Sequence, residues 1–447
     1  MDTGLDAATL GSALARVLAA PPTPPLRAER LDGGYSWLTY AVTGADGRAV
    51  VVRVAPEGGT MEPYDPRVED RALRAAAGSV PAPGVLAVVP DASLLGAPFS
   101  VQTRVPGRVL RLSAVSDPDE RRAYRRAAAT ALGRLHRDGD PGVLGDARDV
   151  GEAYAVELER TVEHYRRAAT GRHPGFEIGV RWLRSRRPRS GEPPCVCHGD
   201  FRFHNLAWTG VGRLGGVLDW ERAWCGDPLA DVAFTRLFSG WCSVADEAAA
   251  VYEEAAGRVV DPARVAYARR FEVVRSHTSG LRALRALADG RAQRSELFGI
   301  GEAGQAGLWA LVRWLEDGPL EPFPDDAVPA SDAEPDGLLP GERLAALRAQ
   351  VPDGSPLARH LDALEEADAR ACADSVAALR AAPVPQDVAD PLRRALATRE
   401  PADAWARAHR VLAAAAARGG PDLVPGLLAL GLRVTGRPSY LSGRIEA

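Results

Sequence analysis

Lysine is absent from this sequence, so all 55 residues counted as lysine or arginine are arginines. Any site that holds a phosphate or carboxylate by positive charge must therefore use the planar guanidinium group or histidine. Cysteine is scarce as well, and five scattered cysteines are too few for a disulfide framework. No apolar run reaches the roughly 20 residues that a membrane helix needs, and the acidic start MDTGLDAATL lacks the apolar core of a secretion signal. We therefore expect a cytoplasmic protein.

The chain also lacks a large excess of charge, since its net charge is −4. Its main basic tract is RSRRPRS at 184–190, which a solvated loop explains better than a nucleic-acid patch does. We expect neither a nucleic-acid partner nor a membrane partner. An apolar content of 46% and a charged content of 26% are typical of globular proteins, and a length of 447 residues predicts two or three domains.

The first quarter of the sequence predicts a short helix followed by a strand-rich region. Residues 6–20 have an amphipathic pattern that PPTPP ends, and residues 31–105 contain alternating apolar runs separated by glycine-containing turns. In AVVVRV, residues 49–54, three valines share one face of the expected strand. Arg53 lies on the opposite face, which makes it a candidate for a functional role.

Helical patterns dominate the rest of the chain and are interrupted by one hairpin. Asp65-Pro66, Asp117-Pro118 and Asp227-Pro228 each offer an N-cap and a first-turn proline, so we expect three helices to begin there. Residues 321–337, EPFPDDAVPASDAEPDG, contain six acidic residues and four prolines, the composition of a linker. The Ala- and Leu-rich residues 338–447 predict an all-helical C-terminal domain.

The hairpin lies within CHGDFRFHNLAWTGVGRLGGVLDWERAWCGDP, residues 197–228. LAW directly follows Asn205 and GVL directly precedes Asp219, so antiparallel pairing brings the ends of these strands within roughly 5 Å of each other. Amide and carboxylate oxygens are suitable ligands for Mg²⁺. Asp200, in the preceding loop, could accept a proton from a substrate hydroxyl. A base followed by two metal holders is the arrangement that kinases use for phosphoryl transfer.

The motifs HGDFRFHN, VLDWE and GDPLADVA resemble those of the aminoglycoside phosphotransferase family, the small-molecule relatives of protein kinases. LDGGYSWLTYAV resembles the family's nucleotide loop, VVVRV its third strand, VEDRALRAA its Glu-bearing helix and GAPFSVQTRVPGRV its hinge. The likeness covers about residues 25–320, and the branch it looks closest to is the kinase-like domain associated with acyl-CoA dehydrogenases.

The resemblance implies an α+β, bilobal protein-kinase-like fold with an all-helical C-terminal domain. After an N-terminal helix and a Pro-rich linker in residues 1–24, a small β-rich N-lobe over 25–106 would bind the nucleotide. A larger, mostly helical C-lobe over 107–320 would carry catalysis and the substrate site. The acidic linker 321–337 would then lead to residues 338–447.

Residue by residue, the resemblance also implies roles for the site. Asp200 would be the catalytic base or would orient the substrate hydroxyl, and Arg202 would stabilise the γ-phosphate. Asn205 and Asp219 would hold Mg²⁺. The ATP contacts would come from the glycine loop, the third strand with its partner helix, and the hinge: Gly33, Gly34, Ser36, Arg53, Glu69, Gln102, Thr103, Arg104 and Val105.

Two positions depart from the family's pattern. Trp37 stands where the family often has asparagine, so it could stack on a ligand or cap the cleft. Arg53 replaces the usual lysine and would offer a bidentate fork in place of a point charge.

Simpler interpretations remain for several residues. Asp200 and Asn205 could each be turn residues, and Glu69 could be solvated. His198 is expected to pack and organise the loop. Asp227 is most simply a helix cap, and Asp231 could buttress the loop. CVCH at 195–198 invites a zinc interpretation, which we do not favour because the strand alternates its side chains and no second pair follows.

Two functions of different classes follow. The first is an ATP- and Mg²⁺-dependent kinase that phosphorylates a hydroxyl of an antibiotic, a secondary metabolite or a hydroxyacyl compound. The alternative is a nucleotide-binding pseudokinase module that regulates a partner enzyme. In either case residues 338–447 could form a homodimer interface or dock a partner. The sequence does not discriminate among substrates.

Overall fold

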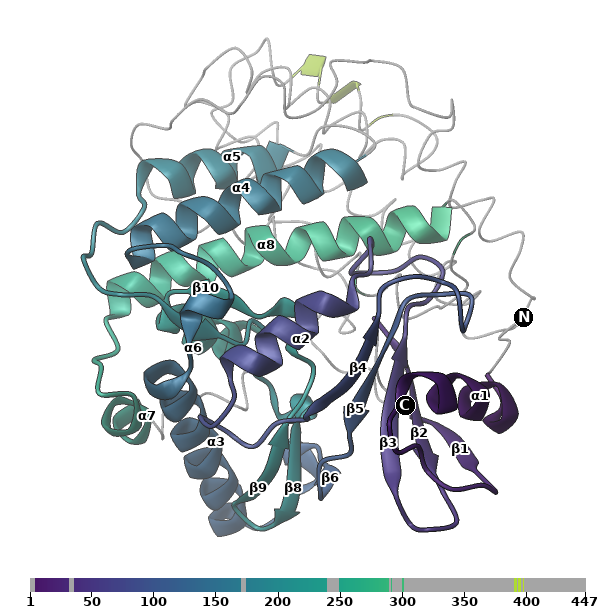
Figure 1. Cartoon of the computed structure of the whole chain (residues 1–447). Coiled ribbons are helices and arrows are strands. Elements are labelled where there is room, and N and C mark those ends of the chain that lie inside the picture. Colours follow the sequence, from purple (N-terminus) through teal and green to yellow (C-terminus); the bar gives the residue numbers. More distant parts are fainter. Residues whose placement is uncertain are drawn as a thin grey trace. The chain divides into compact units, whose positions relative to one another are not determined.

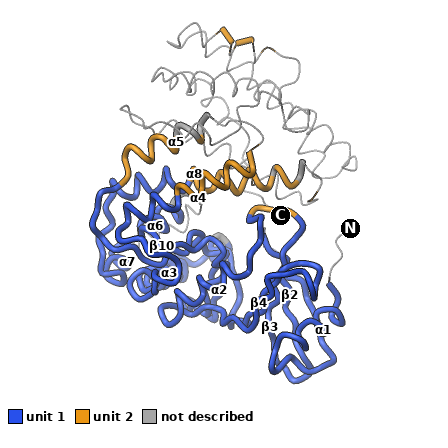
Figure 2. The backbone as a smooth tube through the Cα atoms, turned by 45° about the horizontal axis from the view of Figure 1, so that its top comes forward, with its two compact units in different colours: residues 1–57, 61–157, 188–272 blue, residues 58–60, 158–187, 273–447 orange. Residues whose placement is uncertain are grey.

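The structure, a computed structural model, describes residues 5–31, 36–169, 174–238 and 249–288 and a few isolated positions after them. The predicted linker, 321–337, and nearly all of the predicted C-terminal domain, 338–447, lie outside the described residues. The chain divides into two compact units (Figure 2). The first holds residues 1–57, 61–157 and 188–272, and the second holds 58–60, 158–187 and 273–447.

A five-stranded antiparallel sheet opens the first unit, in the order β1-β2-β3-β5-β4 (Figure 1). Its strands are β1 (Arg27–Leu31), β2 (Leu38–Thr43), β3 (Ala49–Val54), β4 (Val85–Val89) and β5 (Phe99–Thr103). The helix α1 (Ala7–Val17) comes before β1, and α2 (Pro66–Ala75) lies between β3 and β4 in sequence. The strand-rich region is therefore confirmed.

One face of this sheet is the core that the alternation of valines predicted. Val50, Val52 and Val54 of β3 are at most 3% exposed and cluster with Leu10 and Leu14 of α1. Arg53 lies on the other face, as expected for a strand with a side-chain period of two. The side chain of Arg53 therefore points away from the apolar cluster.

The remaining elements of the first unit are mainly helices with short strands. They are β6 (Arg108–Val109), α3 (Pro118–Asp138), β7 (Cys195–Cys197), β8 (Leu206–Gly210), β9 (Arg213–Val217), β10 (Trp224–Gly226), α6 (Pro228–Phe238) and α7 (Ala249–Ala256). The short 3-10 helices are η1 (Leu112–Ala114), η2 (Pro141–Val143), η3 (Phe203–Asn205) and η4 (Trp220–Arg222). β6, β8 and β9 form one antiparallel sheet, and β7 pairs with β10.

The three Asp-Pro steps all start helices, as predicted. The carboxylate of Asp65 accepts a hydrogen bond from the backbone N–H of Arg67, and that of Asp117 from Asp119. Asp227 accepts from the backbone N–H of Leu229 at 2.9 Å. Each cap satisfies an N–H group that the first helical turn leaves without an intrahelical partner.

Small residues let the segment after β5 lie directly against the β8-β9 hairpin. A Cβ atom at Gly216 would come within 2.9 Å of the Val105 side chain, and one at Gly107 within 2.5 Å of the Trp208 carbonyl oxygen. Gly107 also has a φ of 98°, which favours glycine. The predicted hinge therefore touches the hairpin that carries Asn205 and Asp219.

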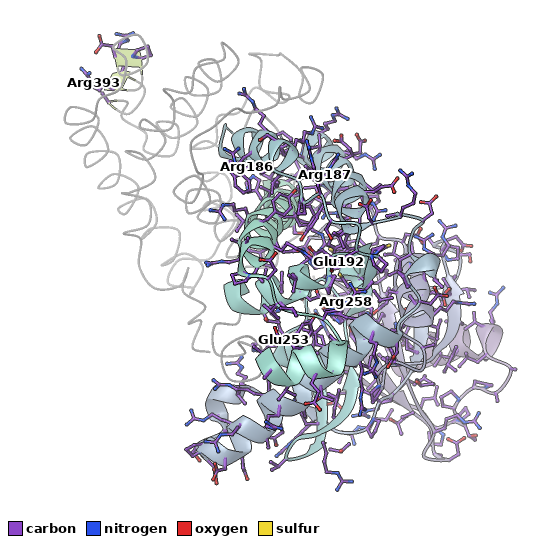
Figure 3. The ribbon with its side chains drawn as sticks, turned by 90° about the vertical axis from the view of Figure 1, so that its left-hand side faces the viewer. Arg186, Arg187, Glu192, Glu253, Arg258 and Arg393 are labelled. Carbon is purple, nitrogen blue, oxygen red and sulfur yellow. The ribbon has the colours of Figure 1, made fainter. Side chains whose placement is uncertain are left out.

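Ion pairs and hydrogen bonds in the first unit join segments far apart in sequence. Arg264 contacts Glu192 at 2.6 Å and Asp227 at 2.7 Å. Arg258 donates to the Pro193 carbonyl at 3.2 Å and lies 3.8 Å from Glu192 (Figure 3). Asp227 is thus both a helix cap and a buried ion-pair partner.

The second unit contains α5 (Pro174–Ser185) and parts of α4 (Val150–Ala168) and α8 (Pro262–Ala288). Tyr165 of α4 stacks on Phe176 of α5 with ring centroids 4.1 Å apart. Arg184 of α5 pairs with Glu159 of α4. Among the helices that the structure describes, none has both the length and the apolarity needed to cross a bilayer.

Candidate active site

The site is built entirely from residues of the first unit, and its centre is the loop that follows β7. His198 and Asp200 are 0% and 7% exposed, and Gly199 between them has a φ of 76°. The His198 ring lies 2.9 Å from the Leu218 carbonyl through Nε2 and accepts from the Asp200 N–H through Nδ1. Burial lowers the pKa of His198, so the ring organises the loop as a neutral group.

Asp231 of α6 holds this loop in place. Its carboxylate accepts hydrogen bonds from the backbone N–H groups of His198 and Gly199, both at 2.7 Å, and from His136 Nε2 at 3.1 Å. Burial alone would raise the pKa of Asp231, but the hydrogen bonds from His136 and the Gly199 N–H, with the two neighbouring imidazoles, outweigh it and lower that pKa. The buried carboxylate therefore stays ionised and fixes the loop.

Replacing Asp231 with Asn is expected to lower the free energy of unfolding by about 2–4 kcal/mol, because one amide oxygen cannot satisfy three donors in a buried site. Thermal and denaturant unfolding would measure the effect. Asp261→Asn is a matched control, since the carboxylate of this half-buried aspartate accepts from the N–H of Ala263, and the change should cost at most about 1 kcal/mol. Equal losses in both variants would contradict the anchoring role.

Asp200 faces an arginine two residues further along the chain. Arg202 contacts it through Nε at 2.5 Å and through a second guanidinium nitrogen at 2.8 Å. The Asn205 side-chain amide donates to the Asp200 carbonyl oxygen at 2.8 Å and to its carboxylate at 3.2 Å. This contact turns the amide nitrogen of Asn205 toward the loop, so its side-chain oxygen is the atom that could bind a metal.

The β8-β9 hairpin brings the backbone of Asn205 next to Leu218, the residue before Asp219. Leu206 pairs with Val217, and the Leu218 N–H donates to the Asn205 carbonyl at 2.8 Å. Asp219 has φ 66° and ψ 62°, the only left-handed non-glycine conformation among the described residues. Such a conformation costs free energy and is common at functional sites.

Arg53 lies at the centre of a cluster of three carboxylates. Its guanidinium contacts Glu69 at 2.9 Å, Asp219 at 2.7 Å and Glu221 at 3.4 Å. Glu69 is 2% exposed and also accepts from the Gln102 side chain at 2.9 Å. The structure therefore brings the predicted Arg53–Glu69 pair together and excludes a solvated Glu69.

Glu221 is a site residue that the sequence interpretation missed. It contacts Arg53, and it accepts a 2.7 Å hydrogen bond from the Ser36 hydroxyl, next to the glycine loop. The sequence contained one indication of this role, since Glu221 is two residues beyond Asp219 in VLDWE. Side chains two apart in extended backbone share a face, but the left-handed Asp219 and the following turn made that spacing hard to interpret.

Three carboxylates surround the single guanidinium of Arg53, so the cluster would carry an excess of negative charge if all three were ionised. Burial raises the pKa of Glu221 to about 8, Asp219 acts in the same direction, and Arg53 opposes both. Burial likewise raises the pKa of Glu69 against the effect of Arg53. A divalent cation at Asp219 would relieve this excess. The oxygen donors of Asn205 and Asp219 suit Mg²⁺, so the residues present fit that ion.

Replacing Glu69 with Gln is expected to lower the free energy of unfolding by about 2 kcal/mol. The change removes one charge from a buried ion-pair network while keeping the shape of the side chain. Asp70→Asn is a matched control on the same helix, because Asp70 pairs only with the largely exposed Arg74, and such pairs contribute about 0.5 kcal/mol. Denaturant unfolding of the two variants compares them, and a larger loss for Asp70→Asn would contradict the network.

The structure shows the surroundings of only some of the residues that are predicted to bind the nucleotide. Gly33 and Gly34 lie outside the described residues. Gln102 directs its side chain to Glu69, and the Thr103 N–H donates to the Gly84 carbonyl at 2.8 Å. Arg104 and Val105 follow the end of β5 and remain candidates for backbone contacts with adenine.

Trp37 caps the cluster around Arg53. It is 5% exposed, meets Tyr64 edge-on at 5.1 Å between ring centroids, and has the Arg53 guanidinium 5.9 Å from its ring. The two roles that the sequence left open, stacking on a ligand and capping the cleft, stay predictions, and the indole packs against protein side chains. The indole shields one side of the ion-pair network from water.

Comparisons with known proteins identify the family of this chain. The sequence profile of the phosphotransferase enzyme family matches residues 27–270, more than half of the chain. Acyl-CoA dehydrogenase family member 10 of Mus musculus is 32% identical over 228 residues, which are 49% of this chain and 21% of that protein. Viomycin phosphotransferase of Streptomyces vinaceus is 31% identical over 144 residues, 30% of this chain and 48% of that protein. The chain thus spans less than half the length of these relatives.

A solved structure supports the fold. The crystal structure of a Ralstonia eutropha protein, provisionally assigned as an aminoglycoside phosphotransferase, covers 69% of this chain and 98% of its own length, with a TM-score of 0.52 and 23% identity. The predicted kinase-like α+β fold is therefore confirmed. The family profile covers both the strand-rich residues and the catalytic loop, and the chain belongs to the phosphotransferase enzyme family.

Proposed function

We propose that this protein is an ATP- and Mg²⁺-dependent kinase that transfers the γ-phosphoryl group to a hydroxyl of a small molecule. The observation that carries the proposal is that Asn205 hydrogen-bonds Asp200 and pairs through its backbone with Leu218, the residue before Asp219, which contacts Arg53. Membership of the phosphotransferase family supports the reaction class. Residues 25–106 would bind the nucleotide, and residues 107–320 would carry catalysis and the acceptor site.

Asp200 would orient the acceptor hydroxyl and take its proton as the oxygen attacks the γ-phosphorus. The bond between that phosphorus and the bridging oxygen breaks, ADP leaves, and the proton passes from Asp200 to solvent. Asn205 and Asp219 would hold Mg²⁺, which neutralises phosphate charge when bound. Arg53 would contact the α- and β-phosphates, and Glu69 would keep its guanidinium in place. Arg202 would leave Asp200 and stabilise charge on the transferred group.

The acceptor is a separate question. The name of one relative says that it phosphorylates viomycin, and other relatives are named as acyl-CoA dehydrogenase family members. An antibiotic, a secondary metabolite and a hydroxyacyl compound are therefore all acceptor classes to test. Residues 338–447 could cover the acceptor site, form a dimer or dock a partner enzyme.

Calorimetric titration of the full chain with ATP tests the nucleotide site. Wild-type protein is expected to bind ATP with Mg²⁺ present and at least tenfold more weakly without it. Arg53→Met should lose at least tenfold in affinity, because the long apolar side chain keeps packing and removes the guanidinium. Arg67→Met is the control, since Arg67 is exposed and pairs with Asp65. Mg²⁺-independent binding, equal in all three proteins, would contradict the proposed site.

A further inference from the structure

A second group of chemically distinctive side chains lies behind the catalytic loop, outside the proposed ATP site. His136 of α3 and the two cysteines of β7, Cys195 and Cys197, are each at most 2% exposed. Their potential ligand atoms all lie within 4.8 Å of one another. The proposed phosphoryl transfer gives none of the three a chemical role, so their convergence needs another explanation.

The two thiols have the spacing of zinc ligands. Cys195 and Cys197 are two residues apart in one strand, so their side chains lie on the same face. Their Sγ atoms are 3.8 Å apart. Two thiolates bound to a tetrahedral zinc ion at about 2.3 Å each lie about 3.8 Å apart. No movement of the strand is needed to bring the sulfurs to this separation.

The imidazole of His136 is held in the tautomer that a metal requires. Asp231 accepts two backbone N–H bonds and is ionised, so the ring nitrogen facing it, Nε2 at 3.1 Å, carries the proton. A neutral ring then presents the lone pair of Nδ1 on its other side. A histidine that donates one N–H to a carboxylate and offers the other nitrogen is the usual arrangement around a bound zinc ion.

Tyr252 of α7 supplies a fourth donor atom. Its hydroxyl lies 2.8 Å from His136 Nδ1, and its ring is 5.6 Å from the imidazole. The phenol currently donates to the lone pair that an ion would use. The phenol oxygen is therefore a candidate for the fourth position, beside the three donors of α3 and β7.

We propose that His136, Cys195 and Cys197 bind a structural zinc ion, with Tyr252 or a water molecule completing a tetrahedral site. Two thiol protons are released to solvent for each Zn²⁺ bound, one of them from the Cys197 thiol that now donates to the Asp227 carbonyl at 3.1 Å. The ion would link α3, and α7 where Tyr252 is the fourth ligand, to β7, which ends at Cys197, the residue before His198. Its function would be to fix the position of the loop that carries Asp200.

CVCH raised a zinc interpretation that the sequence alone did not favour, and the histidine next to the cysteines is not the proposed ligand. His198 turns toward the Leu218 carbonyl, whereas His136 comes from a distant helix. A three-ligand set with one member far away in sequence has no short motif.

Metal analysis of the full chain tests the proposal. Protein purified from zinc-supplemented medium and freed of loose metal is expected to hold about one zinc per chain by mass spectrometry. Cys195→Ser and Cys197→Ser should each hold less than a tenth of that amount. Cys225→Ser is the matched control. Cys225 pairs with Val196 across the two strands and so lies on the opposite face from the thiol pair, and this variant should retain the full zinc content.

Cobalt substitution gives a second readout that does not depend on the variants folding. Wild-type protein loaded with Co²⁺ is expected to show the intense visible bands of a tetrahedral ion and a near-ultraviolet band from thiolate ligands. Wild-type protein with neither zinc nor these cobalt bands would overturn the proposal, and so would serine variants that are folded and keep the metal. Kinase activity enters neither measurement, so failure here would leave the proposed function intact.

Discussion

Replacing Asp200 with Asn is expected to lower phosphoryl transfer about a thousandfold while the affinity for ATP with Mg²⁺ changes by less than about threefold. The amide has the shape of the carboxylate but cannot take the proton of the acceptor hydroxyl, and general-base catalysis typically contributes 10²–10⁴-fold. Steady-state kinetics and titration with ATP measure the two effects separately. Loss of turnover without loss of binding is the pattern that distinguishes a base from a residue needed only for folding.

Asp138→Asn is the matched control for this experiment. Asp138 is also paired with a neighbouring arginine through two hydrogen bonds, both at 2.8 Å, but the pair is exposed on the protein surface. This variant should keep turnover within about twofold of wild type. If Asp200→Asn kept wild-type turnover as well, Asp200 would not be the base. If wild-type protein and both variants bound ATP without any turnover, the pseudokinase alternative would be favoured.

Replacing Asp219 with Asn is expected to have a comparable effect through the metal. The carboxylate is the charged member of the proposed Mg²⁺ pair and also contacts Arg53 at 2.7 Å. Losing it should lower turnover about a thousandfold, equivalent to about 4 kcal/mol of transition-state stabilisation. Turnover measured across a range of Mg²⁺ concentrations should show a half-saturation point at least tenfold higher than that of the wild type.

The dependence on Mg²⁺ separates this effect from a general loss of structure. An excess of Mg²⁺ should restore part of the activity of Asp219→Asn and none of that of Asp200→Asn. The exposed Asp91, which accepts a hydrogen bond from the Ser93 N–H, provides a control variant, Asp91→Asn, that should match the wild type. A Mg²⁺ requirement unchanged in Asp219→Asn would contradict its role as a metal holder.

Much of the fold was predictable from local patterns. The alternation in β3 located the apolar face of the sheet and placed Arg53 opposite it, because the side-chain period of a strand is fixed. The Asp-Pro steps located three helix starts, because a carboxylate cap and a first-turn proline both suit the beginning of a helix. The pairing of LAW with GVL located Asn205 and Asp219 together.

Contacts between distant segments were less predictable. The Ser36–Glu221 hydrogen bond joins residues 185 positions apart, and the His136–Asp231 contact joins residues 95 apart. Neither arises from a period or a turn signal, since both depend on how complete elements pack. The position of Trp37 in the sequence likewise did not predict that its ring would lie beside the Arg53 guanidinium.

The central claim is tested most directly by incubating the full chain with Mg²⁺, ATP labelled in its γ-phosphate and an extract of small molecules supplemented with candidate antibiotics. Mass spectrometry would then identify labelled products, with Asp200→Asn protein in parallel. The proposed function predicts at least one phosphorylated small molecule that wild-type protein forms and the variant does not. A labelled product formed equally by both proteins, or no product from wild-type protein that binds ATP with Mg²⁺, would contradict it.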